Sequence, residues 1–347
     1  MTDNGRKIVV HRAGDVDQLK IEPFELATPK PDEVVIEMAA SGINYADVIV
    51  RMGLYSSAKK YVGWPITPGF EVAGVVRACG ACVTRFKEGD RVFAVTRFGG
   101  YTTHLVVPED QVFLLPGSLT MEQGAAFPAV NMTAWMALSF LAHPRPGDTV
   151  LVHSAAGGVG TCAVQMAKQA QCDVIGVVGA SHKVALAKEL GCREVIDTSQ
   201  QDLWHRVEAL APEGFHVILD ANGVKTLQDS YDHLRPAGKL VVYGFASMMS
   251  KNKGRPNYMK LAWDYLRTPR FNPLDLTTAS KSILAFNLSY LFDRMDLLQV
   301  AMADVLEGFA KGALVPPPVT TYTLDDVAKA HEDLQSGQTT GKLVLVP

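Results

Sequence analysis

The stretch Val150–Gly160, which reads V-L-V-H-S-A-A-G-G-V-G, constrains the fold of this chain more than any other. Its apolar run, Val150–Ser154, ends abruptly at small residues, and this predicts a buried parallel strand. Ala155, Gly157 and Gly160 follow the spacing G-x-G-x-x-G with alanine in the first place, and apolar residues at helical spacing come next. A strand, a glycine turn and a helix place free N–H groups and a helix dipole at one point. The segment therefore predicts a site for the pyrophosphate of a dinucleotide.

The end of the next strand, Asp173–Val178, indicates which dinucleotide is bound. An NAD site places an acidic residue about 20 residues after the glycines, where it binds the ribose 2′-hydroxyl. Here residues 179–183 read G-A-S-H-K and contain no carboxylate. Ser181 and Lys183 offer a hydroxyl and a cation, which suit a 2′-phosphate, so the sequence favours NADPH. The alternative is that Lys183 is an ordinary solvated residue at a helix start.

The composition is that of a globular protein with more than one domain. A chain of 347 residues is long for one core, and its net charge of −3 shows none of the basic excess that a nucleic-acid partner requires. We find no apolar run near the roughly 18 residues of a transmembrane segment, and Met1–Lys7 carries no apolar signal core. Five scattered cysteines are typical of a reducing compartment. We expect a cytoplasmic protein.

The order of the strand and helix patterns predicts an α/β protein. Short strands punctuated by proline, glycine and aspartate are predicted between Lys7 and Leu115, at Val34–Met38, Val72–Ala78, Arg91–Val95, Thr102–Val107 and Val112–Leu115. One or two helices follow between Met121 and Leu141. From Asp148 to Gly244 strands and helices alternate, which predicts a doubly wound parallel sheet with strands at Val150–His153, Val174–Val178, Glu194–Ile196, Val217–Asp220 and Lys239–Tyr243.

The glycine turn lies in the middle of the chain, so the two ends must build the other domain together. We divide the chain into a β-rich domain, residues 1–125 and 275–347, and a dinucleotide-binding domain, residues 126–274, with the active cleft between them. Helices are predicted over much of Leu274–Ala310 and Leu324–Gln335, and a last strand at Lys342–Val346.

The segment Lys239–Ala246 is predicted to be the last strand of the parallel sheet, with its outer edge uncovered. An exposed apolar edge strand promotes aggregation, and pairing with a two-fold mate removes that edge. We therefore expect a homodimer. The alternative is a monomer in which the chain after this strand folds back over the edge.

Several segments resemble those of the medium-chain dehydrogenase/reductase superfamily. They are G-I-N-Y-A-D (Gly42–Asp47), R-M-G-L-Y (Arg51–Tyr55), P-G-F-E-V-A-G-V-V (Pro68–Val76), G-D-R-V (Gly89–Val92), A-A-G-G-V-G and G-K-L-V-L (Gly341–Leu345). Within it the chain is similar to the zinc-free quinone oxidoreductase branch. Y-G-F-A, N-P-L and F-N-L-S-Y-L resemble the synaptic vesicle amine transport protein homologues of that branch. The resemblance implies a β-rich GroES-like catalytic domain and a Rossmann domain.

The chain departs from the zinc alcohol dehydrogenases at the positions of their metal ligands. Asn44 and Phe70 stand where those enzymes have cysteine and histidine, and Phe93–Pro108 contains no cysteine. Without thiolate and imidazole ligands we expect no bound metal, so an alkoxide would have nothing to stabilise it. The chemistry that fits is hydride delivery to a quinone or another α,β-unsaturated carbonyl, where conjugation spreads the developing charge.

The resemblance also implies which residues bind the cofactor. Asn44 would lie near the nicotinamide and its ribose, Lys342 would reach the groove from the last strand, and Ser181 and Lys183 would hold the 2′-phosphate. The full set is Asn44, Thr133, Gly157, Gly158, Val159, Ser181, Lys183, Asn222, Phe245, Asn287 and Lys342. Thr198 replaces a tyrosine that often packs near the adenosine phosphate in this branch, which implies weaker phosphate binding.

Tyr55 and Tyr45 are the candidate catalytic residues together with Asn44. Tyr55 matches the position of the catalytic tyrosine of related enoyl-thioester reductases, and its hydroxyl suits a bond to the substrate carbonyl or protonation of the α-carbon. The alternative is that each tyrosine packs its ring in the cleft wall with a wet hydroxyl. For Glu71 and Asp47 we favour structural hydrogen bonding over acid–base catalysis, because buried carboxylates are usually paired. His153, beside the glycine turn, is interpreted as a core residue.

Two further features need an interpretation. The stretch Ser250–Phe271 is basic and aromatic, with cations from Lys251 to Arg270, so it is either a lid or subunit contact or a peripheral membrane contact. Cys79 and Cys82 form a C-x-x-C in a turn between strands, which we interpret as a coincidence rather than a zinc or redox site.

The leading hypothesis for the function is an NADPH-dependent reductase of a small apolar quinone or enone, with Phe98, Leu54 and Met132 lining its pocket. The alternatives are an enoyl-thioester reductase and, in another class, a cofactor-binding interaction or membrane-associated protein without turnover.

Overall fold

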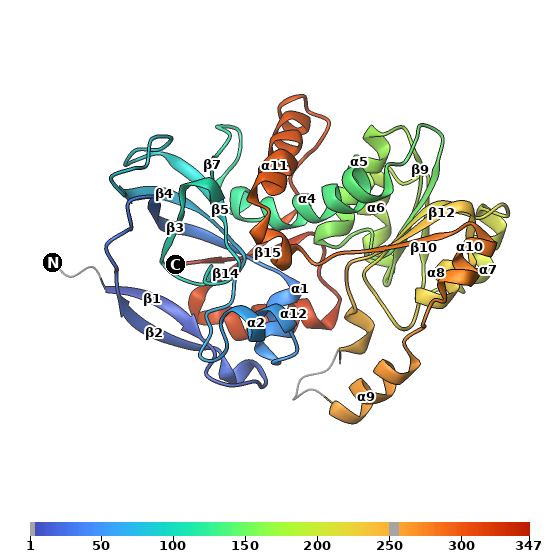
Figure 1. Cartoon of the computed structure of the whole chain (residues 1–347), viewed down its shortest axis with the longest axis horizontal. Helices are drawn as coiled ribbons and strands as arrows, with labels where there is room; N and C mark the ends of the chain where they lie inside the picture. The colour runs from blue at the N-terminus through green and yellow to red at the C-terminus, as the bar shows by residue number, and fades with distance from the viewer. Residues whose placement is uncertain (1–3, 250–256) are drawn as a thin grey trace.

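The computed structural model describes residues 4–249 and 257–347. Two lobes lie side by side, each built on its own β-sheet (Figure 1). The first sheet has the order β14-β15-β3-β4-β5-β7, and β6 pairs with β3. Its strands are β3 (Glu33–Ile43), β4 (Glu71–Cys79), β5 (Arg91–Val95), β6 (His104–Pro108), β7 (Val112–Leu114), β14 (Val319–Thr323) and β15 (Lys342–Val346). The first lobe is thus the β-rich domain that the sequence predicts.

The last strand of the chain lies inside the first sheet. Strand β15 pairs antiparallel with β3, with Leu343 opposite Ile43 and Val344 opposite Gly42. The two ends of the chain thus build one lobe together, as expected. The sequence analysis missed strand β14 and the hairpin of β1 (Asn4–Val9) and β2 (Lys20–Glu25), because β2 and β14 are short, largely polar and poorly buried.

The second sheet is parallel and has the order β10-β9-β8-β11-β12-β13. Its strands are β8 (Thr149–Val152), β9 (Asp173–Val178), β10 (Glu194–Asp197), β11 (Phe215–Asp220), β12 (Leu234–Val242) and β13 (Ser282–Ala285). The order reverses between β8 and β11, and ligands of such sheets bind at the carboxyl ends of the strands beside this switch point. The helices of this lobe are α5 (Gly158–Gln169), α6 (Val184–Leu190), α7 (Leu203–Leu210) and α8 (Leu227–Asp232).

Strand β13 corrects the expectation of a bare sheet edge. It pairs with β12 from Lys239 opposite Ser282 to Val242 opposite Ala285, so the segment Lys239–Ala246 does not have a bare edge. It lies between α10 (Pro273–Ala279) and α11 (Met295–Ala310), which occupy much of the range Leu274–Ala310 that was predicted to be helical. A half-buried strand of four residues is too short to show an alternation of apolar and polar residues, so β13 was not predicted. Because β13 belongs to the second sheet, we propose that the second domain extends at least through residue 285.

A shared apolar core holds the two lobes together. Phe93 of β5 stacks on Phe113 with ring centroids 5.4 Å apart, and its edge meets Phe127 at 6.0 Å. Phe127 directly precedes α4 (Pro128–Trp135) and also contacts Phe309 of α11 at 5.6 Å. Helix α4 packs on α5 of the second lobe, so one continuous core spans both sheets. This packing fixes how the two sheets sit relative to each other.

The remaining helices include α1 (Tyr45–Arg51), α2 (Ser56–Tyr61), α3 (Met121–Ala125), α12 (Val327–Ser336) and α9 (Tyr258–Arg267). Helix α9 has no buried residue and stands away from the second sheet at the lower edge of the view (Figure 1). Lys260 ties it to the chain by donating to the carbonyls of Ser247 and Met248 at 3.1 Å each. Trp263, which would roof the cleft if this stretch were a lid, is 60% exposed. The basic residues Lys251, Lys253 and Arg255 lie outside the described residues.

Across the ranges that the structure describes, no helix has the length and apolar character needed to cross a membrane.

Candidate active site

The glycine turn lies where the chain passes from β8 to α5, at the carboxyl edge of the parallel sheet. Helix α5 begins at Gly158, and Gly157 precedes it with an extended backbone and no side-chain cap. A Cβ on Gly160 would stand 2.1 Å from the carbonyl oxygen of Ser154, so only glycine lets the helix approach the strand this closely. The first N–H groups of α5 have no partner within the helix, and the dipole adds positive charge there. The turn fits a pyrophosphate.

Segments from both lobes converge on this turn. Gly341, just before β15, pairs with Gly157 in an isolated bridge and donates its N–H to the Ala156 carbonyl at 3.0 Å. From the end of β11, Asn222 accepts a hydrogen bond from the Ser154 hydroxyl at 3.4 Å. The structure therefore brings the predicted residues Gly157, Asn222 and the start of β15 together.

Lys342, the next residue, forms a buried cluster with Asn44 and Glu71. Its ammonium group donates to the carbonyl of Ile43 at 2.9 Å, to Asn44 Oδ1 at 2.6 Å and to Glu71 Oε1 at 2.5 Å. The Lys342 and Glu71 side chains are only 3% and 0% exposed. Asn44 Nδ2 donates to the same Glu71 oxygen at 2.8 Å, and the Ala129 N–H donates to the other oxygen at 2.7 Å. The structural role predicted for Glu71 is confirmed, and Asn44 is held from two sides.

Asp47 fixes the backbone around Asn44. One carboxylate oxygen accepts the N–H of Asn44 at 2.8 Å and the other that of Gly69 at 2.7 Å. Complete burial raises the pKa of Asp47 to about 7, while these two hydrogen bonds act in the opposite direction. The predicted structural role is confirmed here too, because both oxygens are used to position backbone groups.

Tyr55 stands in an aromatic wall beside this cluster. Its ring meets Phe70 at 5.9 Å and Phe98 at 6.3 Å, both edge-on. Its hydroxyl donates to Asn287 Oδ1 at 3.0 Å, and this oxygen also accepts from the N–H and the hydroxyl of Ser289. Burial raises the pKa of Tyr55, so the hydroxyl keeps its proton at neutral pH. The two predicted residues Tyr55 and Asn287 thus meet across the lobes, and the hydroxyl is bonded to the protein rather than wet.

Other predicted site residues have different surroundings. Burial raises the pKa of Tyr45 to about 12. The Thr133 hydroxyl donates to the carbonyl of Ala129, one turn back in its own helix, at 2.7 Å. Phe245 is 41% exposed, and Val159 lies half-buried in the first turn of α5. Met132 is 0% exposed, so its predicted place in the pocket wall is wrong; it packs in the core that joins the lobes.

At the adenosine end the structure corrects the expectation that no acid is near. The Ser181 hydroxyl donates to Asp197 Oδ2 at 2.5 Å, and Asp197 is the last residue of the neighbouring strand β10. The Lys183 ammonium donates to the carbonyl of Gly337, after α12, at 2.6 Å. The acid was missed because it arrives through the pairing of β9 with β10, not through sequence proximity to the glycines.

His153 is a core residue, as predicted. It is 0% exposed, its Nε2 lies 3.1 Å from the Ser230 hydroxyl, and burial lowers its pKa. All five cysteines are free thiols, including Cys79 and Cys82. Within the described part of the chain, no three His, Cys, Asp or Glu side chains are grouped as metal ligands.

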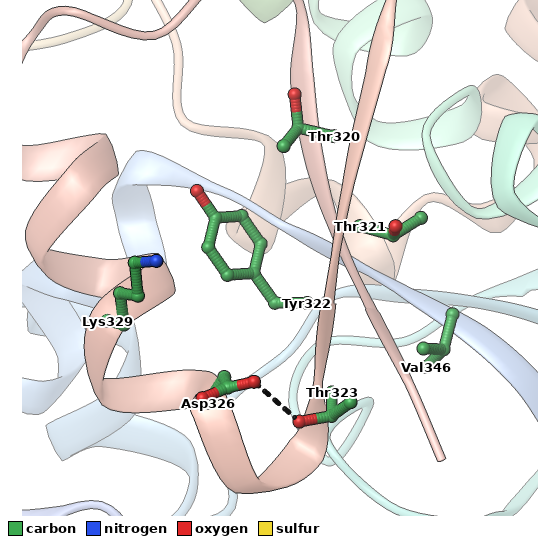
Figure 2. A pocket seen from close by; sticks show the side chains of 7 residues that line it. All are labelled: Thr320, Thr321, Tyr322, Thr323, Asp326, Lys329 and Val346. Atoms are coloured by element: carbon green, nitrogen blue, oxygen red, sulfur yellow. Dashed lines mark hydrogen bonds between the residues drawn. The ribbon is translucent and has the colours of Figure 1, made fainter.

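A separate open pocket of about 390 Å³ lies at the outer edge of the first sheet, between β14, the end of β15 and α12 (Figure 2). Its only hydrogen bond between lining side chains joins the hydroxyl of Thr323 to Asp326 at 2.9 Å. None of the predicted site residues lines it; the lining residues are Thr320, Thr321, Tyr322, Thr323, Asp326, Lys329 and Val346.

The two lobes and the glycine turn define a two-domain protein of the dinucleotide-binding class. Family models agree with this division: residues 30–117 match the alcohol dehydrogenase GroES-like domain, and residues 158–291 match the zinc-binding dehydrogenase family. The chain belongs to the medium-chain dehydrogenase/reductase superfamily, close to the quinone oxidoreductases and the vesicle-protein homologues.

Three relatives show how far the similarity extends. The chain is 34% identical to the human synaptic vesicle membrane protein VAT-1 homolog, over 99% of this chain and 86% of that protein. It is 32% identical to a quinone oxidoreductase of Pseudomonas aeruginosa, over 96% and 97% of the two chains. The crystal structure of Escherichia coli quinone oxidoreductase complexed with NADPH superposes with a TM-score of 0.85 at 28% identity, covering 99% of this chain and 100% of that one.

Proposed function

We propose that this protein is an NADPH-dependent, zinc-independent oxidoreductase that reduces a quinone or another α,β-unsaturated carbonyl. The observation that carries the proposal is the glycine turn with the buried Asn44–Glu71–Lys342 cluster beside it, where Lys342 Cδ lies 3.5 Å from the position of a Cβ on Gly158. The rings of Tyr55, Phe70 and Phe98, which pack on one another, supply the apolar surface. The relatives named as quinone oxidoreductases, one of them complexed with NADPH, support it. The composition supports a cytoplasmic protein.

The residues present fit a dinucleotide along the carboxyl edge of the parallel sheet. The glycine turn would bind the pyrophosphate, with Val159 in the first turn of α5 and Asn222 beside it. Asn44 and Thr133 would lie against the nicotinamide half, and Ser181 and Lys183 against the 2′-phosphate. Phe245, Asn287 and Lys342 would line the groove. When bound, NADPH supplies the hydride.

The chain's own part in the reaction is to orient a flat substrate and to polarise its carbonyl. Phe70 and Phe98 are apolar faces that suit a ring or a conjugated double bond. The protonated Tyr55 hydroxyl can turn from Asn287 to donate to the carbonyl oxygen, where negative charge develops. Net reduction takes one hydride and one proton, and the proton comes from Tyr55 or from solvent.

The fixed hydroxyl of Tyr55 also suits an enoyl thioester, whose α-carbon requires a proton donor. An interaction protein of the same fold would bind the cofactor without turnover. One experiment separates the three: oxidation of NADPH by the purified protein, followed with a panel of quinones, enones and enoyl thioesters. We expect turnover with quinones or enones; turnover restricted to enoyl thioesters, or none with any acceptor, contradicts the proposal.

The variant Tyr55→Phe tests the role of the hydroxyl. If Tyr55 protonates the substrate, kcat should fall on the order of 10²-fold, whereas a quinone that takes its proton from solvent should lose less than about tenfold. Tyr322→Phe is the matched control, because Tyr322 carries the same hydroxyl but lines the separate pocket at the outer edge of the first sheet, where it donates to Asp333. Unchanged kinetics of Tyr55→Phe with every acceptor would exclude Tyr55 from catalysis.

A further inference from the structure

A carboxylate lies where the adenosine ribose of a bound dinucleotide is expected. Asp197 ends β10, and in the parallel pairing it stands opposite Val178, the last residue of β9. The ribose of a Rossmann-bound dinucleotide lies beyond the end of this second strand. The Asp197 carboxylate is therefore beside the position where a 2′-phosphate and a 2′-hydroxyl would differ.

Three donors hold this carboxylate in place. The Ser181 hydroxyl bonds Oδ2 at 2.5 Å, and the N–H and hydroxyl of Ser199 bond Oδ1 at 2.9 and 2.7 Å. These hydrogen bonds lower the pKa of Asp197 below its ordinary value of 3.8, so it is ionised at neutral pH. The Ser181 hydroxyl would otherwise be available to the phosphate, but its hydrogen bond is donated to the Asp197 carboxylate.

The basic side chains nearby make hydrogen bonds of their own. The Lys183 side chain is largely buried and bonds the Gly337 carbonyl, and His182 Nε2 lies 3.0 Å from the Gln338 carbonyl. Both contacts join the second lobe to the segment that follows α12. A 2′-phosphate would thus meet the Ser181 hydroxyl, which is already bonded, and the negative charge of Asp197. A ribose 2′-hydroxyl, in contrast, could donate a hydrogen bond to the Asp197 carboxylate.

We propose that Asp197 is a specificity-determining residue that narrows the preference of this protein for NADPH over NADH. The inference rests on the proposed cofactor site. Ser181 and Lys183 favour the phosphorylated dinucleotide, and Asp197 opposes them by repelling the phosphate and by holding the Ser181 hydroxyl. The chain should therefore bind both dinucleotides.

The test is titration calorimetry of the full chain with four probes: NADPH, NADH, 2′,5′-ADP and 5′-AMP. Asn can accept both hydrogen bonds from Ser199 without the charge, so we expect Asp197→Asn to bind NADPH and 2′,5′-ADP about tenfold more tightly. The Kd of NADH and 5′-AMP should stay the same or rise. Asp173→Asn is the matched control, because Asp173 is the first residue of β9 and lies at the amino end of the strand, away from the expected ribose. It should leave the NADPH-to-NADH affinity ratio unchanged.

Thermal unfolding verifies that each variant is folded, and Asp197→Ser provides a second removal of the charge if Asp197→Asn is unstable. If either variant is folded and binds NADPH and NADH with the same affinity ratio as the wild type, the inference about Asp197 is wrong, but the proposed cofactor site is not affected. Failure of all four probes to bind the wild-type chain overturns the proposed cofactor site and the inference with it.

Discussion

Replacement of Lys342 by methionine should destabilise the protein strongly, because it leaves a buried carboxylate without its cation. An ammonium group has three donors, and Lys342 uses all of them, on the Ile43 carbonyl, on Asn44 and on Glu71. With side chains 3% and 0% exposed, Lys342 and Glu71 form a pair whose disruption costs about 3–5 kcal/mol. In a chain of 347 residues that should lower the unfolding midpoint by roughly 4–7 °C.

Differential scanning calorimetry of five proteins measures the effect: the wild type, Lys342→Met, Glu71→Gln, the double variant and the control Lys311→Met. Lys342→Met should unfold earliest, and the double variant with Glu71→Gln should regain most of the loss, because the neutral amide no longer needs a cation. Lys311→Met is the control: Lys311 is 65% exposed in its pair with Glu307, so solvent screens the pair and its loss should lower the midpoint far less. A shift for Lys342→Met no larger than that of the control, or strictly additive losses in the double variant, would refute the reasoning.

Three other outcomes are expected. His331 is fully buried and bonded to Tyr101, and burial lowers its pKa from 6.5 to about 3. As the pH falls from 6.5 toward 3, His331 takes up a proton only in the unfolded chain. The free energy of unfolding should therefore fall by about 1.4 kcal/mol per pH unit. Urea unfolding of His331→Gln over this pH range should show a smaller slope. Elemental analysis should find no stoichiometric zinc, and a chelator should leave the melting midpoint unchanged, because Asn44 and Phe70 supply neither thiolate nor imidazole; one tightly held zinc per chain would contradict this. Light scattering should give a homodimer, now expected to pair through β13; a mass near 37.6 kDa would exclude it.

The parts of the fold that could be predicted have local signals. The strand before Gly157, the turn itself and helix α5 follow from an apolar run, glycine spacing and helical periodicity within a few residues of one another. Strand β13 could not be predicted in this way, because four residues between two helices show no alternation. Its place is decided by pairing with β12, which is a long-range property.

The same limit applies to the site. The family resemblance indicated Tyr55, Asn287 and Lys342, but no sequence pattern states that Lys342 bonds Glu71, 271 residues away. Asp197 could not be predicted as a site residue because it lies far beyond the expected spacing of about 20 residues from the glycines and reaches the end of β9 only through the pairing of β10 with β9. Buried charge pairs between distant segments are set by sheet register, and register is fixed only when the whole sheet has formed.

The central claim is that hydride passes from NADPH to a conjugated carbonyl bound beside Tyr55. The most direct measurement uses NADPH carrying deuterium at both C4 positions of the nicotinamide, with mass spectrometry of the product formed from an α,β-unsaturated ketone. One deuterium is expected on the β-carbon of the product, and the other should remain on the oxidised cofactor. Product without deuterium, or a labelled cofactor that binds and is never consumed by any quinone or enone, would contradict it.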